Sequence, residues 1–503
     1  MRSCGILMPI FSLPSRGGIG TFGREAFRFV DFLEKAGQKW WQILPLNPTN
    51  YGDSPYQSFS SFAGNPYFID LELLISEGLL TEAEFYNTDF GSDKNKVDYG
   101  KLYYTRLPLL RLAFSRFTPD EKYNEFCKKN SWWLDDYALF MALKNAHNDI
   151  AWIEWEQPLR LREQTAIDNA KEQYSNDIDF YRFVQFKFDE QWRSLKKYAN
   201  AKGIGIIGDI PIYVAYDSCE VWAEPSQFQL SKSLKPKKVA GCPPDAFSED
   251  GQLWGNPLYD WKGMKEDGYS WWKRRLGYAL SIYDKVRIDH FRGFESFYAI
   301  PFGAENAKEG KWMKGPDMDL FLELRREFGE ELPIIAEDLG YLTPAVLKML
   351  KESGFPGMKV LQFAFDTREE SDYLPHNYPN NCVVYTGTHD NDTIIGWTKS
   401  ASPSDVEMAK RYLHVTPDEG INWTMMRAAL ASVADTCILM MPDLIGAGEE
   451  GRINTPSTLG GNWQWRIDGD CINDWLASIV LENTQLYGRA ERAVEESEKE
   501  PEE

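Results

Sequence analysis

The stretch Lys285-Val286-Arg287-Ile288-Asp289 decides the fold, because polar and apolar residues alternate along it and it ends in a carboxylate. This alternation is typical of a β-strand. Seven further short apolar runs end in polar residues and alternate with amphipathic stretches, which indicates strand and helix units around a parallel sheet. They cover residues 5–9, 40–44, 204–209, 333–337, 358–363, 383–386 and 437–441. Eight such units predict an α/β fold, a (β/α)₈ TIM barrel.

The intervening stretches show the periodicity of helices that pack against a sheet. Apolar residues recur every three or four positions over residues 26–33 and over residues 184–199. A third helix is expected to begin at Pro344 and to end just before Gly354. Proline favours the first turn of a helix and glycine the position after the last turn.

The whole chain, residues 1–503, is expected to form one barrel domain with two long insertions. Residues 47–179 follow the second strand and have a mostly helical pattern. Residues 210–268 follow the third strand, are rich in proline, glycine and aromatic residues, and are expected to form a loop-built subdomain. Both would lie over the C-terminal face of the barrel. Residues 492–503 are mostly acidic and are expected to form a disordered tail.

The composition of the 503-residue chain excludes several classes of partner. Its formal net charge of −21 repels phosphate backbones and anionic headgroups, so neither nucleic acid nor a membrane is expected as a partner. Aromatic residues make up 14%, which suits a heavy core or a sugar-binding groove. Seven scattered cysteines indicate neither a disulfide framework nor a zinc site. With an N-terminal apolar run too short for a secretory signal, a cytoplasmic location is expected.

Three glycines, Gly203, Gly205 and Gly208, have the Gly-x-Gly-x-x-Gly spacing of dinucleotide-binding turns. They lie within a predicted strand rather than between a strand and a helix. Close backbone packing therefore explains them better than a nucleotide site. The sequence also lacks the motifs of phosphate-binding loops, serine hydrolases, zinc proteases and calcium loops.

Three carboxylates fall at or just after the C-terminal ends of predicted strands: Asp289, Glu337 and Asp390. Arg287 lies two residues before Asp289, so both side chains share one face of the strand and the guanidinium would keep the carboxylate ionised, as a nucleophile requires. Apolar neighbours would raise the pKa of Glu337 from ~4.3 toward ~6, as an acid requires. This pairing matches retaining glycoside chemistry, in which the two groups lie ~5–5.5 Å apart.

Structural roles remain open for these residues. Aspartate and glutamate at strand ends often cap a helix or pair with a nearby arginine. Two of the five histidines, His290 and His389, lie next to candidate carboxylates, which favours a site, but His290 could equally be a structural histidine.

Aromatic residues in the insertions are candidates for the walls of a groove. Tyr51 and Tyr56 flank a turn with glycine and proline that would direct both rings over the barrel mouth. Phe247 and Trp254 lie in a loop too polar to be buried, which suggests a stacking platform for sugars. Residues 454–466 follow the eighth strand and would close the same rim, with ordinary loop packing as the alternative.

Three segments give the chain a specific family resemblance. Arg287-Ile288-Asp289-His290-Phe291-Arg292-Gly293, Ala336-Glu337-Asp338-Leu339-Gly340 and Thr388-His389-Asp390-Asn391-Asp392 resemble, in order, the catalytic segments of the amylomaltases. These 4-α-glucanotransferases, also called disproportionating enzymes, are related to the α-amylase barrels. The resemblance covers nearly the whole chain and implies a barrel without the C-terminal β-domain of α-amylases.

The resemblance implies a role for each candidate residue. The catalytic residues would be Asp289 as nucleophile, Glu337 as acid/base and Asp390 as transition-state stabiliser. Tyr56 would stack on the sugar next to the cleaved bond, and Arg287 and His389 would hold the same ring. The further positions in the groove or on the acceptor side would be Asp209, Tyr51, Phe247, Trp254 and Asn462.

Two positions depart from the family pattern. Ala246 precedes Phe247 where relatives can carry a second aromatic residue, which leaves the chain-length preference open. Ser457 follows Pro456 where glycine is expected, and this difference does not affect the catalytic argument.

The expected reaction moves α-1,4-glucan segments through a covalent glucosyl-enzyme. The donor would be a maltodextrin or a starch-like α-glucan, and the acceptor glucose or a maltodextrin. The carboxylates would supply charge and proton transfer, so neither a metal nor an organic cofactor is expected. Two alternatives stay open: an α-1,4-glucan hydrolase that uses the same residues, and a non-catalytic maltodextrin-binding protein.

Overall fold

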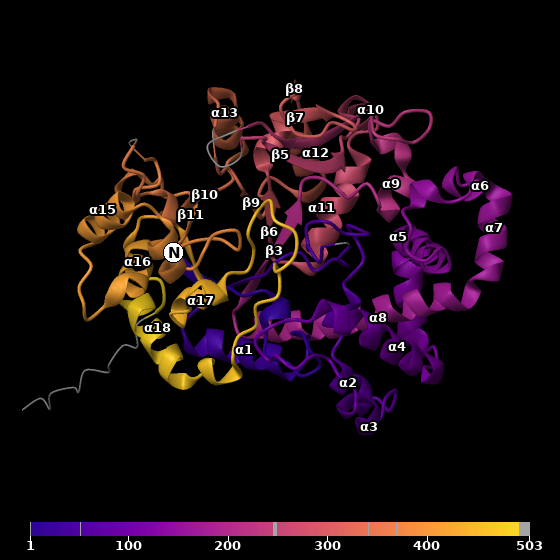
Figure 1. Cartoon of the computed structure of the whole chain (residues 1–503), viewed down its shortest axis with the longest axis horizontal. Coiled ribbons are helices and arrows are strands. Elements are labelled where there is room, and N and C mark those ends of the chain that lie inside the picture. Colours follow the sequence, from indigo (N-terminus) through magenta and orange to yellow (C-terminus); the bar gives the residue numbers. More distant parts are fainter. Residues whose placement is uncertain (1, 51, 245–248, 341, 369–370, 492–503) are drawn as a thin grey trace, which may run out of the picture.

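The structure, a computed structural model, describes residues 2–50, 52–244, 249–340, 342–368 and 371–491. Eight parallel strands form a nearly closed barrel, in the order β10-β11-β12-β1-β2-β3-β6-β9 (Figure 1). These strands are β1 (Ser3–Leu7), β2 (Trp40–Gln42), β3 (Gly205–Pro211), β6 (Lys285–Asp289), β9 (Ile334–Ala336), β10 (Gly357–Val360), β11 (Cys382–Tyr385) and β12 (Thr436–Met440). The predicted fold class is confirmed.

All eight predicted runs coincide with barrel strands to within a few residues, and β6 has the predicted bounds. The run at 358–363 is longer than its strand because Leu361–Phe363 turn into a 3₁₀-helix. Short apolar runs predict these strands well, since a barrel strand is buried on both faces.

The barrel has a seam between β9 and β10, which form no ladder with each other. Two hydrogen bonds bridge it. The backbone N–H of Ala336 donates to the carbonyl of Pro356 at 3.0 Å, and the N–H of Met358 donates to the Asp338 carboxylate at 2.6 Å. Asp338, one residue beyond Glu337, therefore holds the two sides of the seam together.

The helices around the barrel bury the predicted apolar stripes. α1 buries Ala26, Phe29, Val30 and Leu33. α13 begins at Pro344 after a Thr343 cap and ends at Ser353, just before Gly354, as predicted, and Gly354 adopts the left-handed conformation. The helices of this group are α1 (Arg24–Lys35), α8 (Ser175–Ala201), α11 (Ser270–Ile282), α12 (Met318–Phe328), α13 (Pro344–Ser353), α14 (Ile394–Ser400), α15 (Pro403–Leu413), α16 (Gly420–Ala431), α17 (Met441–Leu444) and α18 (Asp474–Leu486).

The interval between β2 and β3 is helical. The helices of this interval, together with α8, lie on one side of the barrel, to the right in Figure 1. They are α2 (Leu71–Ser76), α3 (Glu82–Tyr86), α4 (Tyr99–Arg116), α5 (Glu121–Ala146), α6 (Gln157–Arg160) and α7 (Gln164–Gln173). α5 packs along α8, whose C-terminal end leads into β3.

The interval between β3 and β6 contains secondary structure where a loop-built subdomain was expected. It holds α9 (Cys219–Ala223), α10 (Trp261–Glu266) and the strands β4 (Lys238–Cys242) and β5 (Gln252–Pro257). These strands join β7 (Ser296–Pro301) and β8 (Lys311–Lys314) in an antiparallel sheet of order β5-β4-β7-β8. The expectation of a loop-built subdomain is corrected in this respect. β4 pairs with β5 inside the interval and with β7, which follows β6, and local composition does not reveal these pairings.

Two glycines of β3, Gly205 and Gly208, allow neighbouring aromatic rings to pack closely against the strand. A Cβ atom at Gly205 would lie 2.4 Å from the Trp40 ring, and one at Gly208 would lie 2.2 Å from the Tyr283 ring. Both positions therefore exclude any larger side chain.

Beyond β12, the described residues up to 491 form helices and loops and no further strand element. The predicted tail, residues 492–503, lies outside the described residues. In the described part of the chain, every helix is too short or too polar to span a membrane.

Candidate active site

Arg287 joins two carboxylates at the C-terminal end of β6. One guanidinium nitrogen donates to Asp289 at 2.8 Å, and another donates to Asp209 of β3 at 2.6 Å. Burial alone would lower the pKa of Arg287, but Asp209 and Asp289 raise it well above its ordinary value. The guanidinium is therefore a permanent cation beside Asp289.

Glu337 follows β9 and faces the same mouth. Its two carboxylate oxygens accept hydrogen bonds from the backbone N–H groups of His290, at 2.7 Å, and Leu339, at 2.8 Å. Burial, together with the negative charge of Asp289, raises the pKa of Glu337 to about 7, against the opposing effect of Arg287. Its carboxyl group can therefore carry a proton near neutral pH, in the direction predicted from its apolar neighbours.

His290 fixes the position of Glu337 relative to Asp289. It adopts a left-handed backbone conformation, with φ of 56°, which a non-glycine residue adopts rarely. This conformation directs its N–H to Glu337, while the N–H of Phe291 donates to the Glu337 carbonyl at 3.0 Å. The ends of β6 and β9 are therefore tied by both main chain and side chain.

Asp390 lies in the loop after β11 and is held on two sides. The Asn454 side-chain amide donates to one carboxylate oxygen at 2.6 Å, and Nε2 of His389 lies 3.4 Å from the other. A guanidinium nitrogen of Arg452 also donates to the Asp390 carbonyl at 3.2 Å. The loop after β12 thus orients Asp390, whose side chain is 42% exposed.

Three rings form one wall beside these carboxylates. Tyr56 stacks on His389 with ring centroids 5.1 Å apart and an angle of 16° between the planes. Trp463 lies 5.8 Å from Tyr56 and 5.9 Å from His389. The Tyr56 hydroxyl donates to Asp209 at 2.8 Å, and burial raises the pKa of Tyr56 well above its ordinary value, so the hydroxyl keeps its proton.

Asp209 occupies a different position from the one implied. It is fully buried, and the oxygen that accepts from Arg287 also accepts from Tyr56. The alternation along β3 indicates the face of the strand on which the Asp209 side chain lies. It does not indicate that Tyr56 covers this side chain. Asp209 therefore lies beneath the groove and orients other residues, which corrects the expectation that it lines the groove.

Trp254 and Asn462 lie on the rim. Trp254 meets the His290 imidazole edge to face, at 4.8 Å and 87°, and burial lowers the pKa of His290 to about 4, so that ring is neutral at pH 7. The Asn462 side chain accepts from the N–H of Thr455 at 2.9 Å and donates to Thr458. Asn462 thus holds its own loop in shape.

Two of the predicted residues, Tyr51 and Phe247, lie outside the described residues, as does Ala246. Two others were missed as individual site residues: Asn454 and Trp463. Both fall in the stretch predicted to close the rim, and only their contacts in space reveal what they bind. Among the described residues, no group of three or more His, Cys, Asp or Glu side chains could hold a metal ion.

Comparisons with known proteins agree with this geometry. The family model described as 4-alpha-glucanotransferase, glycoside hydrolase family 77, matches residues 8–472. A 4-alpha-glucanotransferase of Clostridium butyricum is 50% identical, over 96% of this chain and 100% of its own. That of Thermus thermophilus is 47% identical, over 93% of this chain and 95% of its own.

Solved structures give the same result. The amylomaltase of Streptococcus agalactiae, solved in complex with acarbose, superposes with a TM-score of 0.95 at 42% identity, covering 98% of this chain and 100% of that one. The amylomaltase of Corynebacterium glutamicum has a TM-score of 0.77 at 18% identity, covering 97% of this chain and 75% of that one, and shows a shared fold.

Proposed function

The chain belongs to the 4-alpha-glucanotransferase family, and we propose that Asp289, Glu337 and Asp390 carry out its transfer of α-1,4-glucan segments by a retaining double displacement. The single observation that carries the proposal is the hydrogen bond from the N–H of His290 to Glu337 at 2.7 Å. This bond connects Glu337, whose carboxyl group can hold a proton, to His290. His290 directly follows Asp289, the carboxylate that is paired with Arg287.

In the first step, Glu337 protonates the glycosidic oxygen while Asp289 attacks C1 of the donor sugar. The bond to the leaving chain breaks, and a covalent glucosyl-enzyme forms. The raised pKa of Glu337 supports its role as the acid, and the 2.8 Å hydrogen bond from Arg287 supports an ionised Asp289.

In the second step, Glu337 acts as a base. It removes the proton from the 4-hydroxyl of the incoming glucan, whose oxygen attacks C1 and releases Asp289. One α-1,4 bond is formed for each bond broken. These steps draw charge stabilisation and proton transfer from the carboxylates alone.

Asp390 would stabilise the positive charge that develops on the donor sugar, and its hydrogen bonds to sugar hydroxyls would tighten as that charge appears. Tyr56 would stack on the same sugar, with Arg287 and His389 beside it. Asp209 would act as a positioning residue, because its carboxylate holds both Arg287 and the Tyr56 hydroxyl.

The substrates would be a maltodextrin or starch-like donor and a glucose or maltodextrin acceptor. The acarbose complex of the Streptococcus agalactiae relative supports α-glucans as the class of substrate. Trp254, at the rim on the side of His290, would contact the acceptor chain. An ordered acceptor excludes water from the glucosyl-enzyme and favours transfer over hydrolysis.

Incubation with maltotriose tests the function. We expect glucose together with maltodextrins longer than maltotriose. Glucose and maltose alone would identify a hydrolase, and an unchanged substrate would identify a binding protein. A Glu337→Gln variant should bind maltotriose without turning it over, while full activity of this variant would remove Glu337 from its assigned role.

A further inference from the structure

The loop of residues 386–394, called the Asp390 loop below, carries two residues of the proposed site. It begins at Thr386, directly after β11, and ends at Ile394, the first residue of α14. His389 and Asp390 lie between these ends, and Asp390 is four residues from each of them. Because a loop residue is positioned by the scaffold to which its loop is attached, both ends determine where Asp390 lies.

Asp443 holds both ends of the Asp390 loop. It lies in α17, which begins directly after β12, and its side chain is buried. One carboxylate oxygen accepts a hydrogen bond from the Thr386 hydroxyl at 3.0 Å, and the other accepts from the backbone N–H of Ile394 at 2.8 Å. A single side chain therefore connects the two ends of the loop and fixes the distance between them.

Hydrogen bonds inside the loop make it a compact turn. The Asn391 side chain accepts from the N–H of Thr388 at 2.8 Å, and the Thr388 hydroxyl accepts from the N–H of Asp390 at 3.3 Å. A displacement of either end of the loop is therefore transmitted to Asp390, because the turn between the ends moves as a unit.

The surroundings of Asp443 are unfavourable for an acidic side chain. Burial raises the pKa of its carboxyl group to about 7, against the lowering effect of the hydrogen bonds from Ile394 and Thr386. The charge of Asp392 raises this pKa further, whereas a basic partner would lower it. Burying an acidic group in such surroundings costs free energy, so packing alone does not explain an aspartate at this position.

We propose that Asp443 is a positioning residue for the transfer reaction, because it holds the Asp390 loop at both ends and so keeps Asp390 in its productive orientation. The inference rests on the proposed function, since it needs Asp390 as the transition-state stabiliser. Asp443 acts through Asp390 and is not itself a catalytic residue. A misplacement of ~1 Å at a group that contacts the reacting sugar can lower the rate ~100-fold.

Asp443→Asn tests the proposal, because it keeps the shape of the side chain but weakens the hold on the loop. Asparagine has one oxygen, which can accept from Thr386 or from Ile394, and its NH₂ group then faces the other donor. The kcat of maltotriose disproportionation should fall about tenfold or more, while KM changes less than about threefold. A fall in kcat of less than threefold, or a loss confined to KM, would overturn the inference.

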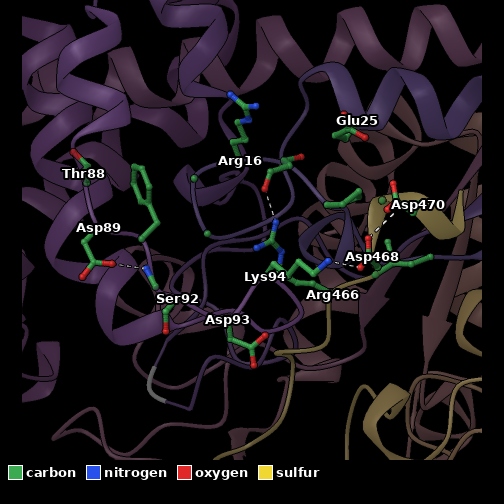
Figure 2. A pocket seen from close by; sticks show the side chains of 18 of the residues that line it. Arg16, Glu25, Thr88, Asp89, Ser92, Asp93, Lys94, Arg466, Asp468 and Asp470 are labelled. Carbon is green, nitrogen blue, oxygen red and sulfur yellow. Dashed lines mark hydrogen bonds and ion pairs between the residues drawn. The ribbon is translucent and has the colours of Figure 1, made fainter.

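Asp70→Asn is the matched control. Asp70 is also buried, and its carboxylate also accepts from a threonine hydroxyl, that of Thr21 at 2.6 Å, and from a backbone N–H, that of Leu73 at 3.0 Å. Thr21 closely follows the loop of residues 14–18, which lines a cavity of about 510 Å³ (Figure 2). The described lining residues of this cavity include none of the proposed catalytic residues.

The control variant loses the same kind of hydrogen bonds and should lower the melting temperature, but its kcat should stay within about 1.5-fold of wild type. Equal losses of kcat in Asp70→Asn and Asp443→Asn would overturn the inference, because Asp443 would then contribute only to the stability of the fold.

Thr386 offers a second test that leaves the buried carboxyl group in place and that decides the question if Asp443→Asn fails to fold. Thr386→Val keeps the shape of the side chain and removes the hydroxyl, whereas Thr386→Ser keeps the hydroxyl. The valine variant should lose about threefold or more in kcat, and the serine variant should lose less. Equal kcat values for the two variants would overturn the inference, because the hydrogen bond to Asp443 would then have no effect on the reaction.

Asp390→Ala separates this inference from the proposed function. It should lose more kcat than Asp443→Asn does, because it removes the carboxylate that Asp443 positions. If Asp390→Ala loses activity and Asp443→Asn does not, only the inference fails. If Asp390→Ala keeps the kcat of wild type, the role of Asp390 in the proposed function fails.

Discussion

Asn454 donates its side-chain amide to the Asp390 carboxylate at 2.6 Å, across 64 positions of sequence. The N–H of Asn454 also donates to the His389 carbonyl at 3.1 Å, so one residue of the loop after β12 fixes two neighbours in the loop after β11. This relationship makes Asn454 a positioning residue for the proposed transition-state stabiliser.

Replacing Asn454 with alanine should lower kcat more than it changes KM, because Asp390 then loses the donor that orients it. A hydrogen bond to a charged group contributes ~1.5–3 kcal/mol, which corresponds to roughly a 10- to 100-fold loss of rate. Maltotriose disproportionation measures both constants. Unchanged kcat would show that His389 alone orients Asp390.

The reaction rate should fall as the pH rises through about 7. Glu337 must carry a proton to act as the acid, and burial raises its pKa to about 7. The pH profile of kcat/KM with maltotriose should therefore have an alkaline limb near that value. A rate that stays constant up to pH 9 would contradict the assignment of Glu337 as the acid.

Stability should depend on the same ionisation. The pKa of Glu337 lies above that of an unfolded glutamate, so the folded state binds the proton more tightly. The stabilisation is fully present below pH ~4.5 and is lost as the pH rises through about 7. At pH 7 to 8, a Glu337→Gln variant should thus have a higher melting temperature, relative to wild type, than it has at pH 4.5. If the difference in melting temperature between the variant and wild type is the same at pH 4.5 and at pH 8, Glu337 titrates as an exposed group does.

The Tyr56 hydroxyl can be separated from its ring. Tyr56→Phe keeps the stack on His389 but removes the donor to Asp209, which is fully buried. The free energy of unfolding should fall by ~1–3 kcal/mol, since a buried carboxylate loses a partner. Tyr86→Phe is the control, because its exposed hydroxyl donates to Glu72 and its loss should change stability by less than ~0.5 kcal/mol. Equal effects of the two variants would contradict the role of Asp209.

Ser457→Gly should raise stability and leave activity unchanged. Ser457 is exposed and adopts a φ of 62°, in the left-handed region that glycine tolerates and other residues adopt at a cost of ~1–2 kcal/mol. Part of the gain is offset by the larger backbone entropy of glycine in the unfolded chain, so we expect ~0.5–1 kcal/mol. A differential scanning fluorimetry comparison checks the sign, and a lower melting temperature would contradict it.

The barrel strands could be predicted from sequence because each is a short, local, buried run. β6 agrees with its predicted bounds for this reason. The antiparallel sheet could not be predicted, since β4, which pairs with β5 on one side, pairs on its other side with β7, which lies beyond β6 in the chain. A composition rich in proline and glycine conceals strands whose partners are distant.

The site shows the same limit. The strand-end positions of Asp289 and Glu337 follow from local pattern, and their catalytic roles stay predictions. The burial of Asp209 does not follow, because strand periodicity gives the face of a side chain but not the residue that covers it. Asn454 was missed as a partner of Asp390 for a related reason, since its contact joins two loops that only the closed barrel brings together.

The seam between β9 and β10 leaves the ring of strands incompletely hydrogen-bonded. Seven pairs of neighbouring strands are joined by ladders of hydrogen bonds. The eighth pair, β9 and β10, is joined by one main-chain hydrogen bond and by the bond to the Asp338 side chain. Glu337 lies between the last residue of β9 and Asp338, so we expect local opening of the barrel to begin beside the proposed acid/base residue. Backbone amides of β9 should consequently exchange with deuterium sooner than those of β6.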